Sequence, residues 1–471
     1  MRIWREARVK TSGLLFALML PLLIPTQCDK ILLYMPPSLF SLSPSEKVAR
    51  MPGFTLSVTG DNFNQYSIIV FDGNRKSTTL VSDTKLTCSI ASEDITMGAA
   101  ETDKQIPVKV INSLNENSSS SILYFTVKSI HAFVEARKIA DAPTYYYAEI
   151  HPVLCLHPSG NLYCAWNEKL NLFFCRSTDG GDTWTTPTLL TSNQQGDRYP
   201  NPALAADSQG TLFLVCNQSS DIYLYISKDQ GQTWEPRRNL SGFTTGSSLP
   251  NIHIDQSDRI FVVFCAVGNY DYRVRILLST DFGLTWTQLN PILNFDFFSG
   301  GRTQIVSDQG GYLYVTWPTA YGRYIFHKFC HSSDNGQNWS EIKNVLNSSR
   351  VALGVDTAGG VHVVGGDMYL PYMYRLQLAS SVDRGLTWQY TLLSNSWDPA
   401  DLAIDTVDNF HVAWKDQFIR SIDRGLSWTG PVVYTTVSSA VNPAMAADAV
   451  GNIYIVWWNQ EGGIYFSQSQ E

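Results

Sequence analysis

One short pattern, Ser-x-Asp-x-Gly-x-x-Trp, occurs six times in this chain of 471 residues. Its aspartates, each the third residue of the pattern, are Asp179, Asp229, Asp281, Asp334, Asp383 and Asp423. Consecutive aspartates are 50, 52, 53, 49 and 40 residues apart. A period of this length predicts an array of similar supersecondary units, each burying its apolar face against the next.

A second phrase precedes every copy of the pattern: an apolar run ends in a turn of the type Asp-x-x-Gly and continues into an alternating strand. Examples are PALAADSQGTLFLVC, IVSDQGGYLYVTW and LAIDTVDNFHVAW. The phrase occurs seven times, and after its last copy the chain ends where a seventh pattern would stand. Each unit is thus predicted to hold four strands, and the last unit is one strand short.

The segment FVEARKIADA, residues 133–142, precedes the first unit and supplies the missing strand, since an unpaired sheet edge is a liability. We therefore predict an all-β fold in which residues 128–471 form a seven-bladed β-propeller of roughly 49 residues per blade, closed by this N-terminal strand. The composition agrees, because 12% aromatic and only 16% charged residues suit stacked strands.

The pattern is the Asp-box, or BNR repeat, and residues 128–471 resemble the sialidase-like Asp-box propellers. The residue types have a physical reason: Asp can bond backbone N–H groups in a tight turn, Gly accepts positive φ, and Trp packs between sheets. We therefore interpret the six aspartates as structural. A catalytic or calcium-binding role is disfavoured, because these turns lie on the face opposite the usual ligand face of a propeller.

Residues 29–127 have a different character, with short β-runs separated by turns such as Asp72-Gly73. This spacing predicts a small β-sandwich. The strings PGFTLSVTGDNF, VSDTKLTCSIA and PVKVIN resemble the IPT/TIG family of immunoglobulin-like domains. The resemblance implies a spacer, or alternatively a binding module. No residue of this segment is a candidate for a catalytic role.

The first 28 residues are predicted to be an export signal. Arg2, Arg5, Arg8 and Lys10 precede an apolar run at 13–24, which is too short to span a bilayer. Cys28 then resembles the acylated cysteine of bacterial lipoproteins, although Gln27 departs from the small residue preferred before it. We expect a secreted or cell-surface protein without a transmembrane helix in the mature chain, either lipid-anchored at Cys28, as in an outer-envelope lipoprotein, or simply cleaved near it.

Charge and cysteine spacing exclude several functions. The net charge is −8 and no basic run could follow a phosphate backbone, so nucleic acid is not an expected partner. The eight cysteines form no Cys-x-x-Cys pair and have no histidine at metal-ligand spacing. We therefore predict no metal site and no cofactor. The cysteines on strands are expected to be small buried core residues; the alternative is that Cys164 pairs with Cys155 or Cys175 across neighbouring strands.

The ligand face of a propeller is built by the loops that flank its inner strands. Aligning the seven units on the Asp-x-x-Gly turn places one residue of each at the start of the inner strand: His151, Asn201, Leu249, Arg302, Arg350, Pro399 and Asn442. Arg302 and Arg350 come from adjacent blades, and a pair of guanidinium groups suits a carboxylate. The alternative is that both arginines are solvated or ion-paired.

Sialidases hold the sialic-acid carboxylate with three arginines, and Arg302 and Arg350 look like two of them. The family's Arg-Ile-Pro motif is absent from the first blade, and no Tyr nucleophile with its Glu, or Asp acid/base, falls in a family motif, so catalytic residues stay unknown. The loops around blades three to six are unusually aromatic, which suits stacking on sugar rings or on a peptide, although such loops also pack on one another. Asp296, Tyr369, Trp397 and Asp398 are the ligand-binding candidates from these loops.

These observations predict an exported or cell-surface binding protein that engages a glycan or an extracellular protein through this face of the propeller and is not catalytic. The alternative is a sialidase-like glycoside hydrolase, an exo-α-sialidase, with a degenerate motif.

Overall fold

The computed structural model of the chain describes residues 35–48, 53–95, 103–128, 132–142, 150–192, 200–242, 248–268, 271–293, 297–298, 302–321, 324–348, 350–369 and 373–470. Their regular structure is β, apart from one short 3-10 helix, η1 (Ser92–Ile95). Among these residues no helix is long and apolar enough to cross a membrane. The chain divides into two compact units, and almost all of the second lies beyond Thr126.

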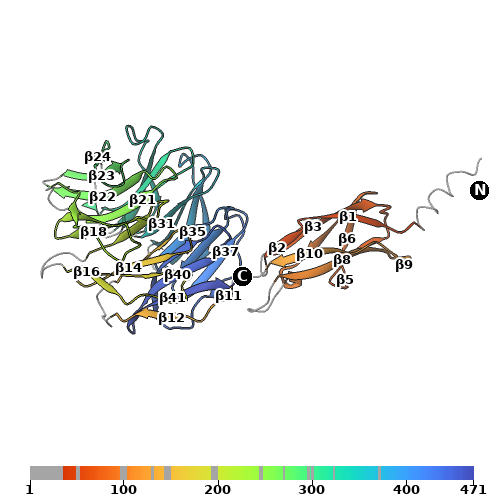
Figure 1. The fold of residues 1–471 in the computed structure, drawn as a ribbon. Coiled ribbons are helices and arrows are strands. Elements are labelled where there is room, and N and C mark those ends of the chain that lie inside the picture. Colours follow the sequence, from red (N-terminus) through yellow and green to blue (C-terminus); the bar gives the residue numbers. More distant parts are fainter. Residues whose placement is uncertain are drawn as a thin grey trace, which may run out of the picture. The chain divides into compact units, whose positions relative to one another are not determined.

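The N-terminal unit is a sandwich of two antiparallel sheets (Figure 1). One sheet has the order β1 (Ser38–Ser43), β3 (Phe54–Asp61), β7 (Lys85–Ile90) and β6 (Thr78–Ser82). The other has the order β2 (Glu46–Val48), β10 (Leu123–Lys128), β8 (Lys104–Asn112), β4 (Ser67–Phe71) and β5 (Asn74–Arg75), with β9 (Asn115–Ser119) beside β8. Alternate residues of the strands are buried, and Phe125 packs against Phe54 and Phe71 with ring centroids 5.4 and 5.5 Å away.

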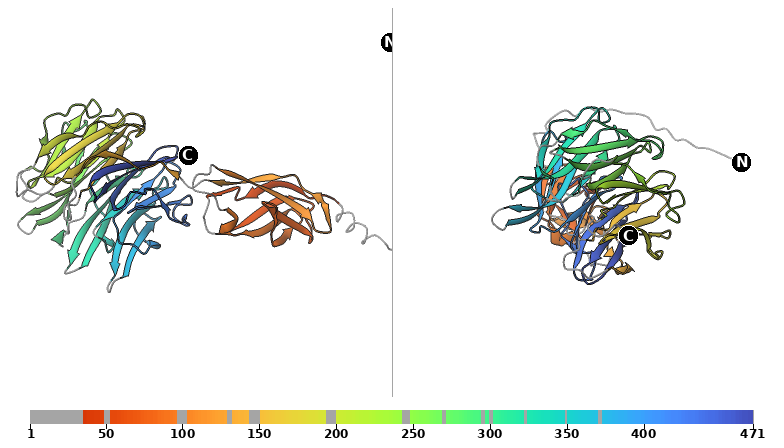
Figure 2. Two further views of the ribbon diagram at one scale, coloured as in Figure 1. Left: turned by 90° about the horizontal axis from the view of Figure 1, so that it is seen from below. Right: turned by 90° about the vertical axis from the view of Figure 1, so that its left-hand side faces the viewer.

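The described residues of the second unit form seven sheets that follow one another along the chain (Figures 1 and 2). The first sheet holds β13 (Val153–Leu156), β14 (Leu162–Glu168), β15 (Asn171–Ser177) and β16 (Thr188–Ser192). The second holds β17 (Ala203–Ala206), β18 (Leu212–Gln218), β19 (Asp221–Ser227) and β20 (Arg238–Asn239). The third holds β21 (Ser248–Ile254), β22 (Ile260–Gly268), β23 (Asp271–Ser279), β24 (Thr287–Gln288) and β25 (Ile292–Leu293).

The fourth sheet holds β26 (Phe297–Phe298), β27 (Gln304–Ser307), β28 (Leu313–Tyr321), β29 (Tyr324–Ser332) and β30 (Lys343–Leu346). The fifth holds β31 (Val351–Val355), β32 (Val361–Tyr369), β33 (Met373–Ser381) and β34 (Gln389–Ser394). The sixth holds β35 (Ala400–Ile404), β36 (Phe410–Trp414), β37 (Gln417–Ser421) and β38 (Val432–Val433). The last sheet holds β39 (Ala440–Ala447), β40 (Ile453–Asn459) and β41 (Gly463–Gln470), with β11 (Ala132–Phe133) and β12 (Arg137–Ala140) beside β41.

The series of sheets closes on itself. The innermost strand of each sheet contacts that of the next, from β13 through β17, β21, β27, β31 and β35 to β39, and β39 contacts β13. In the last sheet, β12 pairs antiparallel with β41, with Arg137 opposite Phe466, so the start of the unit supplies the outer strand of its final sheet. The fold is therefore an all-β propeller in which β12 covers the edge of β41.

Neighbouring sheets are held together by apolar clusters that each draw on two sheets. The tryptophan of the repeated pattern contributes to them: Trp234 meets the edge of Phe174 at 5.1 Å between ring centroids, and Trp388 meets Phe329 at 5.1 Å. In both pairs the phenylalanine belongs to the preceding sheet. Packing of aromatic rings at these junctions stabilises the contact between neighbouring blades.

Candidate functional site

A cavity of about 110 Å³ lies where the inner strands begin. Six of the seven aligned first positions line it: His151, Asn201, Arg302, Arg350, Pro399 and Asn442. The side chain of the seventh, Leu249, lies outside the described residues. Because the units repeat around one axis, equivalent positions converge at this end of the channel.

Arg302 has a buried N–H donor that could bond a ligand. Its side chain is half-buried, and its Nη2 atom is shielded from solvent with no hydrogen-bond partner among the residues that the structure describes. Burial, and secondarily the charge of Arg350, lowers the pKa of Arg302 from 12.5 to about 10. The guanidinium therefore stays charged at neutral pH. A buried donor without a partner is costly, and an anion in the cavity would relieve that cost.

Arg350 is engaged differently, because its guanidinium spans the channel. Nη1 donates to Oδ1 of Asn442 at 2.7 Å, and Nη2 lies 3.3 Å from Nε2 of His151. Asn442 also donates from Nδ2 to the carbonyl of Ile150 at 2.9 Å. Arg350 thus links three inner strands, and it contributes positive charge to the cavity.

Asp401, two residues after Pro399 on β35, is the acidic residue among the described lining residues. Its carboxylate accepts the backbone N–H of Met445 at 2.7 Å and that of Leu402 at 3.0 Å. Burial raises the pKa of Asp401 from 3.8 to about 6, although these hydrogen bonds and the charge of Arg302 act to lower it. A carboxyl group with such a pKa changes its charge near physiological pH.

Gln304 occupies the equivalent position on β27. Its Nε2 donates to the carbonyl of Val351 at 2.7 Å, and its Oε1 accepts the N–H of Leu353 at 2.7 Å, so it ties β27 to β31. Sequence reasoning missed both Asp401 and Gln304. The signal was present, because side chains two residues apart on a strand point to the same side, but only the first position of each strand was aligned.

The other candidates from the sequence do not join this group. Trp397 is 62% exposed, and Asp398 accepts a hydrogen bond of 2.5 Å from the Ser396 hydroxyl, and neither lines the cavity. Asp296 and Cys28 lie outside the described residues, as does the side chain of Tyr369. Within the described part of the chain, no group of three His, Cys, Asp or Glu side chains is placed to hold a metal ion.

Comparison with protein families places the chain. A model described as "BNR repeat-like domain" matches residues 127–262 and 169–393, which together span more than half of the sequence. The chain belongs to the BNR repeat-like family. In this BNR repeat-like protein, residues 37–127 match a model described as "IPT/TIG domain". Among curated proteins, no sequence matches the chain.

Solved structures similar to this BNR repeat-like protein include one of unknown function and two sialidases. A protein of unknown function from Dyadobacter fermentans is 15% identical, with 71% of this chain and 99% of that chain covered and a TM-score of 0.47. A Hadza microbial sialidase is 12% identical, with 93% of each chain covered and a TM-score of 0.47. The NanB sialidase of Streptococcus pneumoniae is 11% identical, with 92% of each chain covered and a TM-score of 0.47.

The BNR repeats themselves are turns closed by their own side chains. In the third copy, the Ser279 hydroxyl donates to Oδ1 of Asp281 at 2.8 Å, and Thr285 donates its N–H to Oδ1 at 2.8 Å and its hydroxyl to Oδ2 at 2.5 Å. These bonds, led by the threonine hydroxyl, lower the pKa of Asp281 to about 2. The other copies repeat the Ser-to-Asp bond. The carboxylates are thus occupied by the turn.

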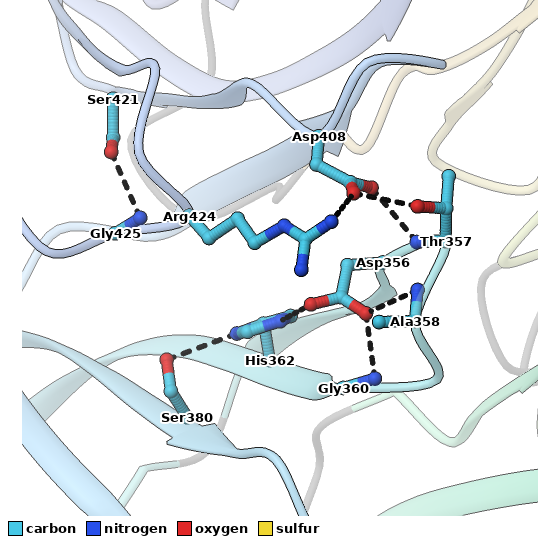
Figure 3. A network of polar contacts seen from close by, with 10 residues as sticks. All are labelled: Asp356, Thr357, Ala358, Gly360, His362, Ser380, Asp408, Ser421, Arg424 and Gly425. Carbon is cyan, nitrogen blue, oxygen red and sulfur yellow. Dashed lines mark hydrogen bonds and ion pairs between the residues drawn. The ribbon is translucent and has the colours of Figure 1, made fainter.

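A second polar constellation of the BNR repeat-like propeller lies at the opposite ends of the inner strands (Figure 3). Nε2 of His362 is 3.2 Å from Oδ2 of Asp356, and Nδ1 is 3.0 Å from the Ser380 hydroxyl, an order that invites comparison with a hydrolytic triad. The next blade repeats the contact with His411 and Asp405 at 3.2 Å.

Two further blades place a tyrosine where these histidines stand. Tyr314 donates to Asp308 at 2.8 Å and Tyr454 to Asp448 at 3.2 Å. In every case the donor is six residues after the aspartate and bonds the same turn. A contact that recurs with His or Tyr ties the turn to its own strand, and it does not require the reactivity of an imidazole. The cavity at Arg302 is therefore the candidate functional site.

Proposed function

We propose that this protein is an exported or cell-surface binding protein whose propeller holds an anionic group of a glycan, such as the carboxylate of an acidic sugar, at Arg302, without cleaving the glycan. The observation that carries the proposal is the buried Nη2 of Arg302, which has no hydrogen-bond partner among the described residues and belongs to a residue that lines the cavity. A carboxylate oxygen there would gain a charge-assisted hydrogen bond.

The size and lining of the cavity support a small anionic group over a whole sugar. A volume of about 110 Å³ is below the few hundred Å³ of a typical ligand pocket, so only the charged end of a larger ligand would enter. Arg302, Arg350, Asn201 and Asn442 bring N–H groups to the cavity from the starts of four inner strands. Those of Arg350, Asn201 and Asn442 also bond Asn442, Asn217 and Ile150, respectively. This arrangement favours recognition of a carboxylate and leaves the remainder of the ligand at the mouth of the channel.

The absence of cleavage is proposed from the chemistry of the lining. Sialidase-type catalysis needs a tyrosine nucleophile with a carboxylate partner, and neither Tyr nor Glu is among the described residues that line the cavity. One observation favours the alternative, a sialidase-like exo-α-sialidase. Asp401, with a pKa raised to about 6, has the property expected of a general acid.

The binding test uses residues 29–471 titrated by calorimetry with N-acetylneuraminate and D-glucuronate, and with glucose as the neutral probe. We expect binding of an acidic sugar but not of glucose, and Arg302→Met should weaken it by about tenfold or more. Arg75→Met, at an exposed arginine on β5, is the matched control that removes one charge elsewhere. Equal affinity in the wild type and Arg302→Met would remove the site from consideration.

The catalytic alternative is tested with a fluorogenic α-sialoside and the same proteins. We expect no fluorophore release. Release that disappears in both Arg302→Met and Asp401→Asn would make the protein a glycosidase and overturn the non-catalytic proposal.

Export rests on the sequence of residues 1–28 and is tested on protein recovered from cells. We expect intact mass to show removal of residues 1–27. An added acyl mass on Cys28 would establish a lipid anchor, and an unmodified Cys28 would establish simple cleavage. Retention of the initial methionine and its following residues in the mature protein would contradict export by this signal.

A further inference from the structure

Asp401 places a negative charge inside a site that otherwise attracts anions. Its carboxylate is fixed by the N–H groups of Leu402 and Met445, so it cannot swing away from the cavity without losing two hydrogen bonds. Arg302 lowers the pKa of Asp401, and Asp401 in turn raises that of Arg302. The charges of Arg302 and Asp401 therefore stabilise each other.

The groups that share the cavity with Asp401 or bond it come from several elements. β32 also packs against β35, and His362, the titratable residue among its described side chains, bonds Asp356 instead. The segment before β27 contributes Arg302, the residue before β31 is Arg350, and His151, before β13, lines the same cavity. β39 contributes the N–H of Met445, and β36 places Ala413 opposite Asp401 in the ladder. Besides the two arginines, Asp401 and His151 are the ionisable residues among the described cavity lining.

We propose that the protonation state of Asp401 controls how tightly the site binds an anion. The ionised carboxylate of Asp401 competes with a bound anion for the positive charge of Arg302, and protonation of Asp401 removes this competition. This inference rests on the proposed function and names how the same site is regulated. It predicts a ligand site that binds anions more tightly in mildly acidic surroundings than at neutral pH.

The direction follows from linkage. An anion near Asp401 stabilises its protonated form, so ligand binding raises the pKa of Asp401, and by reciprocity a lower pH strengthens binding. Each unit by which the ligand raises that pKa corresponds to about a tenfold change in affinity across the titration. The pKa of about 6 in the free protein places the change between roughly pH 5 and 7.5.

The experiment measures sulfate affinity of residues 29–471 by calorimetry between pH 5 and 8. Sulfate keeps its charge throughout this range, so only the protein titrates. We expect the wild type to bind about tenfold more tightly at pH 5 than at pH 7.5. Asp401→Asn should bind at pH 7.5 as tightly as the wild type does at pH 5 and should show no pH dependence. Asp398→Asn, outside the cavity lining, is the matched control and should keep the wild-type profile.

A His151→Gln variant tests whether His151 causes the pH dependence of binding, because glutamine can still accept a hydrogen bond from Arg350. We expect it to keep the pH dependence, and loss of that dependence here but not in Asp401→Asn would overturn the proposal. Weaker binding by Asp401→Asn would also overturn it, since the ionised carboxylate would then be supporting anion binding instead of opposing it. Binding of sulfate with a flat wild-type profile contradicts the role of Asp401 and leaves the anion site standing. If sulfate and the acidic sugars fail to bind at any pH, the proposed function itself is wrong, and the role of Asp401 fails with it.

Discussion

Arg350 and Asn442, which are 92 residues apart in the sequence, are joined by a hydrogen bond of 2.7 Å between Nη1 and Oδ1. Asn442 passes the connection on to Ile150 through a bond of 2.9 Å from Nδ2 to the carbonyl oxygen. The starts of three inner strands are thereby held together beside the proposed anion site. Stability and ligand binding should consequently respond together when this link is removed.

Asn442→Gly tests the link. Asn442 has φ +51, which glycine adopts without strain, so the substitution removes the side chain alone. We expect the free energy of unfolding to fall by about 1–2 kcal/mol, measured by denaturant titration, and anion affinity to weaken because Arg350 loses its acceptor. Ser439→Gly, at φ +59 and an exposed position, is the control and should change stability by less than about 0.5 kcal/mol. Equal effects of the two variants would show that the link contributes nothing.

Two glycines with the same backbone angle separate strain from crowding. Gly160 and Gly385 both have φ +86, but a Cβ at Gly160 meets nothing within 4 Å, whereas one at Gly385 would lie 2.1 Å from the Phe329 ring. We expect Gly160→Ala to lower the free energy of unfolding by about 1 kcal/mol and Gly385→Ala by about 2–4 kcal/mol. Similar losses in thermal or chemical denaturation would mean that Phe329 gives way without cost.

The Asp-box turns should make the propeller sensitive to acid. The folded-state pKa of about 2 for Asp179, Asp229, Asp281, Asp334 and Asp383 is below the ordinary value of 3.8. Their contribution is therefore complete above pH 3.8 and is lost as the pH falls through about 2. We expect the melting temperature to drop between pH 4 and pH 2.

Asp281→Asn should lower the melting temperature at neutral pH and make the acid-induced drop smaller, because one titrating group is gone. Asp141→Asn, at a side chain that is 95% exposed, serves as the comparison and should leave the drop unchanged. An unaltered acid profile in Asp281→Asn would contradict the assignment of the effect to these turns.

Buried cysteines should be inert in the folded protein. Burial raises the pKa of Cys216 to about 12 and that of Cys265 and Cys330 well above its usual range. The thiolate is the reactive form, so we expect these three thiols to react with a thiol reagent at pH 8 only after unfolding in guanidinium. Rapid labelling of all three in the native protein would indicate that the strands carrying them open readily.

The repeated pattern was sufficient to predict the propeller, because its information is local. Each Asp-box bond joins residues no more than four apart, as between Asp281 and Thr285, and the apolar alternation of each strand is visible without knowing its neighbours. The same regularity aligned Arg302 with Arg350, and both line the cavity. What repeats in the sequence must repeat in space once the blades stack around one axis.

The pairing and burial of each residue in that alignment were decided only by the tertiary structure. Arg302 and Arg350 occupy the same position of two blades, yet one leaves a buried donor without a described partner and the other bonds Asn442. Asp401 gains its raised pKa from burial beside strands far away in the sequence. Repeats specify which positions converge, whereas charge, desolvation and hydrogen-bond pairing depend on what the other blades place opposite, and no single repeat contains that information.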